Sequence, residues 1–448
     1  MLNNLYKRLK LTPPKILTLG FACIILIGCI LLHLPIASQN GEEIDWLSAL
    51  FTATSATCVT GLVVVDTGTT FSLFGQIVIL SLIQIGGLGF MTFATLIALI
   101  IGKKISLKER LLIQAALNVV SPQGVVKLVK TVLLFTLVNE GAGALLLSIR
   151  FAFEMPISKA IYYGIFHSIS NFNNAGFDLM GGFQSLTGYV NDPLVTLVIS
   201  SLIILGGIGF IVVHDFIEYK TFSKFSLHSK VVLCTTGALV VLGTLFIFLL
   251  EFHNPKTLQP LSTSGKILGS IFQSVTSRTA GASTVNIPDL TDSTVFLLII
   301  LMFIGASPGS TGGGIKTTTF VTLLGAAWSQ IKGKEDVVFF RQRLVPTMIY
   351  KALTVAISSL LLVIVVTMIL SITETGKNFL VLLFEATSAF GTVGLSMGLT
   401  PNLTSAGKII IALTMFIGRL GPLTIAIALA HKDSKELYRH PKGRFMIG

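Results

Sequence analysis

Four short segments of this chain carry residues suited to binding a dehydrated cation. Each is about a dozen residues long, is rich in Ser, Thr and small side chains, and closes on or just after a glycine. A dehydrated monovalent cation needs several oxygen ligands in place of its water shell, and rings of backbone carbonyls provide them. Only glycine freely adopts the backbone conformations that aim successive carbonyls at one axis. The segments are 51–62, 166–177, 272–283 and 384–395, with glycines Gly61, Gly176, Gly281 and Gly394.

These glycines are 115, 105 and 113 residues apart, which indicates one unit duplicated four times around one pore. A single such glycine is more simply explained as the C-cap of a helical turn. Four at matching positions favour a ring of carbonyls. The predicted ring residues are Val59, Thr60, Gly61, Asn174, Ala175, Gly176, Thr279, Ala280, Gly281, Thr392, Val393 and Gly394.

The third segment departs from the other three. It has Ala282 where the others have a large apolar residue, and it is one residue shorter from its phenylalanine to its glycine. The carbonyl donors beside Gly281 are therefore left open among Arg278, Thr279 and Ala280. We expect a ring that is only pseudo-fourfold.

The composition of the chain indicates the environment of these segments. Of 448 residues, 52% are apolar and only 12% are charged, and the mean hydropathy is +0.85, which excludes a soluble domain of this length. Windows long enough to cross about 30 Å of hydrocarbon are 16–34, 73–101, 131–149, 194–213, 231–250, 294–325, 347–370 and 405–430. The sequence predicts eight membrane spans.

The four segments lie between successive spans and are too short and polar to cross a bilayer alone. Irregular backbone is tolerated at membrane depth only inside protein or beside water. We therefore predict an all-α polytopic membrane protein of four tandem helix, re-entrant loop and helix units. The expected units are 1–110, 111–220, 221–335 and 336–430, followed by a cytoplasmic tail, 431–448.

Charge placement predicts the orientation of these spans. Most of the 32 Lys and Arg residues lie in five stretches that alternate with the four segments. By the positive-inside rule both termini are cytoplasmic and the segments open outward. The net charge of +12 is then mainly a topology signal, and no nucleic-acid partner is expected. The stretches are 1–15, 103–130, 214–230, 329–351 and 431–448.

The second span of unit three contains a glycine-rich run that cannot stay helical, because glycine and proline both disfavour a helix interior. We predict that this span breaks and forms a gating loop, 305–314. A phosphate-binding loop is excluded because Lys316 does not follow a glycine. The predicted gate residues are Gly305, Ser307, Pro308, Gly309, Ser310, Thr311, Gly312, Gly313, Gly314, Lys316 and Arg419.

Arg419 lies within the last apolar span, where a charge normally faces a partner or water. We predict that it reaches the 305–314 loop and adds a positive barrier to cations. Snorkelling, or capping of a kink before Pro422, is the alternative. Bracing and structural roles both stay open for the other intramembrane charges, Glu140, Glu251, Arg278 and Glu385.

Together these motifs resemble the Trk/Ktr/HKT superfamily of potassium uptake proteins over residues 16–430, and within it the membrane subunit of bacterial Ktr systems, of KtrB or KtrD type. In that family a serine at the first ring position accompanies sodium permeation, so the resemblance implies K⁺ selectivity here. It also implies an intramembrane loop in the broken span. The further implications are a bacterial plasma-membrane location, a homodimer, and a cytosolic RCK/KTN ring of KtrA or KtrC type that binds ATP or ADP.

The predicted function is channel-like, K⁺-selective uptake, with Na⁺ as an activator. The chain carries no Walker or Rossmann motif, so no cofactor of its own is expected. An intramembrane enzyme is disfavoured, because the seven histidines are scattered and lack catalytic spacing. A strictly coupled sodium/potassium cotransporter stays as the alternative.

Overall fold

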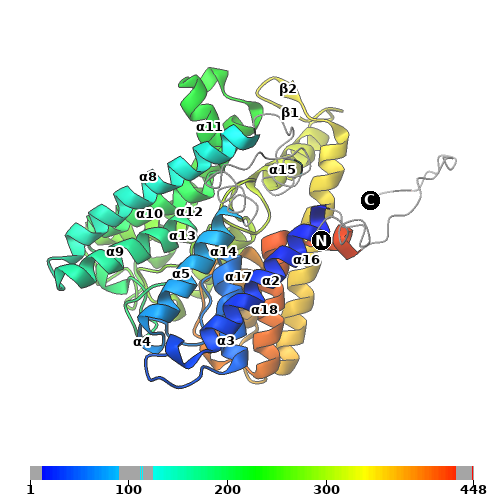
Figure 1. Cartoon of the computed structure of the whole chain (residues 1–448). Helices are drawn as coiled ribbons and strands as arrows, with labels where there is room; N and C mark the ends of the chain where they lie inside the picture. The colour runs from blue at the N-terminus through cyan, green and yellow to red at the C-terminus, as the bar shows by residue number, and fades with distance from the viewer. Residues whose placement is uncertain (1–12, 90–110, 112–113, 115–124, 430–445, 447–448) are drawn as a thin grey trace.

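The structure, a computed structural model, describes residues 13–89, 111, 114, 125–429 and 446. The predicted tail and most of the basic stretch 103–130 lie outside these ranges. Within them the chain is almost entirely helical (Figure 1). The helices are α2 (Pro13–His33), α3 (Trp46–Cys58), α4 (Thr67–Thr70), α5 (Leu73–Leu88), α8 (Val125–Phe151), α9 (Ile157–Phe172), α10 (Pro193–Gly207), α11 (Phe210–Tyr219), α12 (Leu227–Glu251), α13 (Thr263–Thr276), α14 (Asp292–Phe303), α15 (Thr317–Ile331), α16 (Pro346–Thr373), α17 (Phe379–Gly391), α18 (Ser405–Leu420) and α19 (Pro422–Leu429).

The same three-part pattern occurs four times. A long apolar helix (α2, α8, α12 or α16) is followed by a short helix (α3, α9, α13 or α17) and an extended return. A second apolar helix (α5, α10, α14 or α18) then follows. Side-chain caps begin three of the short helices, through Asp45, Ser262 and Asn378. The predicted succession of helix, re-entrant segment and helix is confirmed.

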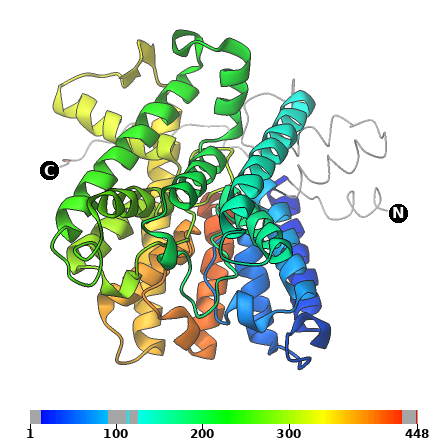
Figure 2. The same cartoon turned by 90° about the vertical axis from the view of Figure 1, so that its left-hand side faces the viewer.

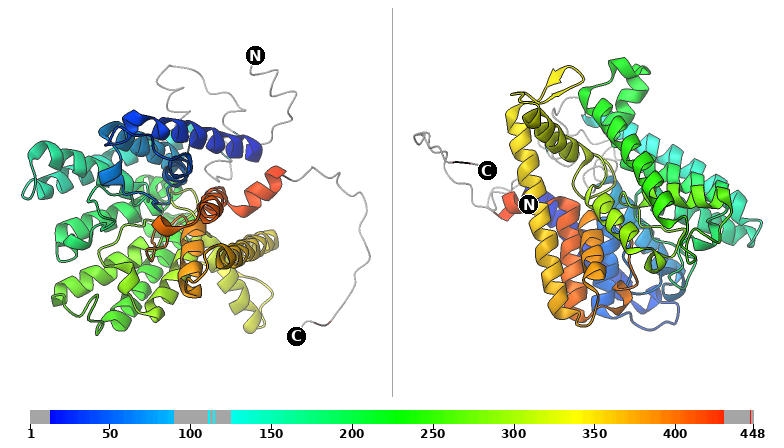
Figure 3. Two further views of the ribbon diagram at one scale, coloured as in Figure 1. Left: turned by 90° about the horizontal axis from the view of Figure 1, so that it is seen from below. Right: turned by 180° about the vertical axis from the view of Figure 1, so that it is seen from behind.

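The units close into a ring. The second helix of each unit packs on the short helix of the next, as α5 on α9, α10 on α13 and α14 on α17, and α18 closes the circle on α3. Seen from below in Figure 3, the blue, cyan, green and orange units follow one another around the centre. The phenylalanine that opens each segment (Phe51, Phe166, Phe272 and Phe384) is fully buried.

The predicted spans are correct in part. In the described part of the chain, α2, α8, α12 and α16 are long and apolar enough to cross a bilayer. The span predicted at 73–101 has a helix that ends at Leu88, and its remainder from residue 90 lies outside the described ranges. These helices make the chain a multi-pass membrane protein.

Two of the predicted spans are not continuous helices. The 194–213 span bends by 94° between α10 and α11, and the 405–430 span bends by 91° between α18 and α19. Both breaks contain a glycine with positive φ, Gly209 at 96° and Gly421 at 84°, a conformation closed to most side chains. Hydropathy does not detect these bends because both arms are apolar.

The 294–325 span breaks as predicted, between α14 and α15. Past α15 the chain makes a small hairpin of β1 (Val338–Phe339) and β2 (Gln342–Arg343). This hairpin and α11 project from the same end of the molecule (Figures 1 and 2).

Candidate functional site

The four segment glycines meet in a closed ring at the centre of the fold. A Cβ added at Gly61 would overlap the carbonyl oxygen of Ala175 in the next unit. The same relation repeats from Gly176 to Ala280 O, from Gly281 to Val393 O, and from Gly394 back to Thr60 O. We call Gly61, Gly176, Gly281 and Gly394 the glycine ring. Its close backbone approach leaves no room for a side chain at these positions.

The backbone of the ring repeats the same conformations in all four units. Each glycine has positive φ, at 91°, 65°, 79° and 93° in chain order. The residue two before it also has positive φ, although it is not glycine: Val59 at 57°, Asn174 at 61°, Thr279 at 82° and Thr392 at 49°. Left-handed conformations at such residues are uncommon and are held only by their surroundings.

The third unit keeps this register despite its shorter segment. The N–H of the residue before the ring glycine bonds five residues back in units one, two and four, as from Thr60 to Ser55 O at 2.8 Å. In unit three Ala280 N bonds only four residues back, to Thr276 O at 2.9 Å. The third segment is one residue shorter at the end of α13, so Thr279 and Ala280 still occupy the positions equivalent to Asn174 and Ala175.

Glycines of the second helices let these helices approach the ends of the short helices. A Cβ at Gly86 would overlap Thr57 O, and Gly206 and Gly418 stand in the same relation to Phe172 O and Phe390 O. In each pair the carbonyl belongs to the residue four before a ring glycine. The small residues thus set the distance between the second helices and the ring.

The glycine-rich loop, residues 305–314, lies directly against the ring segments. A Cβ at Gly312 would overlap Thr279 Oγ1, and one at Gly313 would overlap Thr392 Oγ1. The loop is also tied to unit two, where Gly207 O accepts from Ser307 N at 3.1 Å. Its further bonds to unit two are Thr311 N to Gly206 O at 3.2 Å and Phe210 N to Gly309 O at 2.8 Å.

The loop also folds back on itself. Ile304 and Ile315 form a parallel bridge, and Ala306 N donates to Gly313 O at 3.3 Å. Ser310 Oγ donates to Ser307 O at 2.7 Å. The loop is thus held together by hydrogen bonds within its own residues, and its side chains are small.

The side chains of one lysine and one arginine donate hydrogen bonds to the glycine-rich loop. Lys316 donates from Nζ to Gly312 O at 2.7 Å and to Gly313 O at 3.3 Å. Arg419 donates to Thr311 O of the loop and to Gly86 O of unit one, and its contact to Gly87 O is 3.2 Å. Arg419 therefore contacts the loop, as predicted, and it also joins units three and four to unit one.

The other intramembrane charges divide by position. Glu140 accepts from Asn173 Nδ2 at 2.9 Å, beside the ring segment of unit two, and from Gln84 Nε2 at 3.2 Å. Glu251 instead ends α12 and accepts from Thr291 N at 2.9 Å, capping the start of α14 away from the ring.

In units three and four the side chain after the segment phenylalanine bonds to the return segment, and sequence reasoning had singled out only Glu385, with its role left open. Glu385 accepts from Ser396 Oγ at 2.9 Å, on the return strand of unit four. Gln273, at the same place in unit three, donates to Ser283 Oγ at 2.8 Å. The sequence signal for this role is the polar residue that follows the segment phenylalanine. These side chains brace the returns to the short helices.

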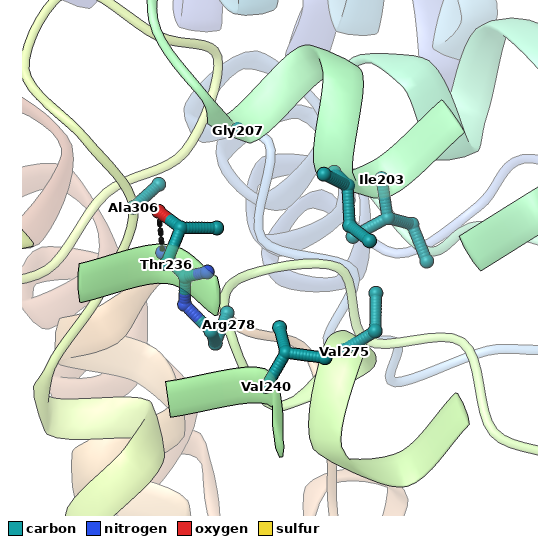
Figure 4. Close-up of a pocket in the computed structure, with 8 residues that line it drawn as sticks. Ile203, Gly207, Thr236, Val240, Val275, Arg278 and Ala306 are labelled. Atoms are coloured by element: carbon teal, nitrogen blue, oxygen red, sulfur yellow. Dashed lines mark hydrogen bonds between the residues drawn. The ribbon is translucent and has the colours of Figure 1, made fainter. Parts of the chain in front are cut away.

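Arg278 lies behind the ring in a small cavity of about 10 Å³, close to the space that one water occupies (Figure 4). Its Nη2 lies 3.4 Å from Thr236 Oγ1, and its Nε has no partner. The cavity is lined by Ile203, Ile204, Gly207, Thr236, Val240, Val275 and Ala306. Since Ala306 belongs to the glycine-rich loop, this cavity lies between the end of α13 and that loop.

The ring offers oxygen ligands from backbone carbonyls. Within the described ranges, no three His, Cys, Asp or Glu side chains gather as they would around a divalent metal. Converging carbonyls suit a dehydrated monovalent cation.

Comparisons with known proteins agree with this architecture. The TrkH family profile, described as a cation transport protein, matches residues 24–439. The Ktr system potassium uptake protein B of Bacillus subtilis is 48% identical over 446 residues, covering 100% of this chain and 99% of that protein. The potassium/sodium uptake protein NtpJ of Enterococcus hirae is 41% identical, with 98% of both chains covered.

A solved structure, that of the potassium transporter TrkH from Vibrio parahaemolyticus, shares the fold. Its TM-score is 0.71 at 19% identity, with 92% of this chain and 84% of that chain covered. The family profile and the full-length relatives establish the kinship that the repeated segments predicted. The chain belongs to the TrkH family of cation transport proteins, within the Trk/Ktr/HKT superfamily.

Proposed function

We propose that this protein is the ion-translocating membrane subunit of a Ktr-type potassium uptake system. The glycine ring is its selectivity filter, and K⁺ permeates it as in a channel. One observation carries the proposal: four glycines from four units close a ring in which each approaches the carbonyl of its neighbour. The choice of K⁺ as the ion rests on the names of the relatives, which are potassium uptake proteins.

The glycine-rich loop is the gate in this proposal. It contacts Thr279 and Thr392, both two residues before a ring glycine, so its position decides whether an ion passes beyond the filter. Its bonds to unit two are backbone hydrogen bonds, and those to Arg419 and Lys316 come from side chains, so they can break and re-form without moving a whole helix. Arg419 adds a positive barrier at this level, because a cation passing it meets like charge in a low-dielectric site.

The surrounding assembly follows from the resemblance to Ktr systems. We place the protein in the bacterial plasma membrane as a homodimer, with both termini cytoplasmic and the filter opening outward. A cytosolic RCK/KTN ring that binds ATP or ADP regulates it, and Na⁺ is an activator. The end carrying α11 and the β1–β2 hairpin is the cytoplasmic end, since stretches 214–230 and 329–351 are basic.

Rubidium or potassium uptake tests the filter in a transport-deficient bacterium that also expresses a KtrA- or KtrC-type partner. Gly61→Ser should lose selectivity against Na⁺, because its side chain meets Ala175 O. Gly41→Ser is the matched control: Gly41 also has positive φ, at 73°, but no atom lies within 4 Å of an added Cβ. Uptake indifferent to Gly61→Ser, or equally changed by both variants, would reject the filter.

A coupled sodium/potassium cotransporter is the second candidate, and one observation favours it. NtpJ, a full-length relative, is named a potassium/sodium uptake protein. Proteoliposomes separate the two candidates. A fixed Na⁺ to K⁺ flux ratio across imposed gradients supports the carrier, whereas large downhill K⁺ fluxes with no fixed ratio support the channel.

A further inference from the structure

Two serines behind the glycine ring hold the ring backbone directly. Ser55 Oγ accepts from Gly61 N at 3.0 Å, and Ser388 Oγ accepts from Gly394 N at 3.1 Å. Both serines lie six residues before their glycine, on α3 and α17, and both are fully buried. The two glycines they hold are neighbours in the ring, because Gly394 packs on Thr60 O.

Holding a glycine N–H fixes the carbonyl before it. In a planar trans peptide unit the N–H and the C=O point in opposite directions. The N–H of Gly61 is turned back to α3, so the carbonyl of Thr60 must face away from that helix, toward the ring. The same constraint orients the Val393 carbonyl through Ser388. The contacts agree, since Thr60 O and Val393 O are the atoms that an added Cβ at Gly394 and Gly281 would meet.

Units two and three use their hydroxyls differently. Ser170 Oγ donates to Phe177 O at 2.7 Å, and Thr276 Oγ1 donates to Ala282 O at 2.5 Å. Both acceptors belong to the residue after the ring glycine, so these bonds hold the peptide units 177–178 and 282–283 and not the unit that precedes the glycine. The ring thus consists of two halves, and only units one and four anchor the carbonyl that precedes the glycine.

We propose that Ser55 and Ser388 are specificity-determining residues of the transporter. They hold the Thr60 and Val393 carbonyls toward the permeating ion, and this inference rests on the proposed K⁺ filter. If the hydroxyl of Ser55 or Ser388 is lost, the peptide unit that it holds can rotate. Its N–H can then point at the cation and repel the cation. The relaxed half of the ring then discriminates less well between K⁺ and the smaller Na⁺.

The test compares Na⁺ competition against Rb⁺ uptake in Ser55→Ala and Ser388→Ala. Each serine has a matched control one residue earlier: Thr54 and Thr387 bond their own helices, at Leu50 O and Leu383 O, both at 2.7 Å. Thr54→Val and Thr387→Val therefore remove a hydroxyl from the same helix without touching the ring. Selectivity should fall about three- to tenfold in each alanine variant, as for one lost hydrogen bond, and should stay at the wild-type level in the valine variants.

Further variants keep the proposal falsifiable. Ser55→Thr retains the hydroxyl and should retain selectivity. If an alanine variant does not accumulate in the membrane, the cysteine variant replaces it, because a thiol is a weak acceptor and should cause a similar loss. Wild-type selectivity in the alanine variants, or an equal loss in the valine controls, overturns the proposal. Unselective uptake by the wild type would instead reject the filter itself.

Discussion

At the scale of single residues, the residue three before the ring glycine faces the preceding unit in units two, three and four. In unit two this residue is Asn173, which donates to Gln84 of unit one at 2.8 Å. In unit three it is Arg278, in the cavity beside Gly207 of unit two. In unit four it is Gly391, where a Cβ would lie 2.6 Å from a carbonyl of unit three. The repeats therefore share a backbone and differ in the polarity of their contacts.

Arg419→Ala should raise potassium flux if the guanidinium is a barrier. A barrier lowered by about 1 kcal/mol gives roughly a fivefold increase. Initial Rb⁺ uptake at matched membrane expression measures this change. Lys408→Ala, which removes a charge from the same helix outside the loop contacts, should leave flux unchanged. Lower flux in Arg419→Ala would assign the arginine to holding the loop rather than to repelling ions.

Among the elements, the short helices and second helices are spaced by glycines at their crossings. Gly206 on α10 contacts Phe172 O at the end of α9. Because interiors are close-packed, a single added methyl at such a crossing must move a helix. The loop fastens to the same place through Thr311 N and Gly206 O. Spacing at this crossing thus affects both the glycine ring and the glycine-rich loop.

Gly206→Ala should destabilise the purified protein by roughly 1–3 kcal/mol, the usual cost of overpacking. Gly237→Ala on α12 is its control, since no atom lies within 4 Å of a Cβ there. Thermal melting in detergent, followed by the loss of monodisperse protein, compares the two variants. Equal melting temperatures would show that α9 and α10 separate easily and that the crossing is not critical.

For the whole molecule, the ring makes the first and last units neighbours. Helices α18 and α3 pack together, and Gly394 contacts Thr60 across more than 300 residues of sequence. No single unit contains a complete site. Under the proposed filter, an ion in the ring would contact all four units at once and would stabilise the closed arrangement as a whole.

Potassium or rubidium should raise the melting temperature of the intact protein by a few degrees at saturating concentration, since a ligand that binds only the folded state stabilises it. Sodium should raise it less. Gly394→Ala should abolish the difference between the ions, whereas Gly376→Ala, at a positive-φ glycine with no atom within 4 Å of an added Cβ, should preserve it. Identical shifts with every cation, including a large organic one, would indicate an ionic-strength effect and no ring site.

The repeat, the membrane environment and the break before α15 could all be predicted from the sequence, which also left contact with the loop as one of two interpretations of Arg419. These features depend on local composition: apolar length, helix-breaking residues and the rarity of a charge in an apolar span. The periodic spacing of the glycines can also be recognised without any knowledge of contacts.

The bends at Gly209 and Gly421, the register of Thr279 and the partners of each ring glycine become visible only in the folded chain. Helices α10 and α11 are both apolar, so a hydropathy scan merges them into one span. Hydropathy does not record the direction in which the backbone runs. The oxygen that Gly61 meets belongs to Ala175, and the hydroxyl that holds its N–H belongs to Ser55. Such pairings are fixed by close packing between units, and no local pattern in the sequence encodes them.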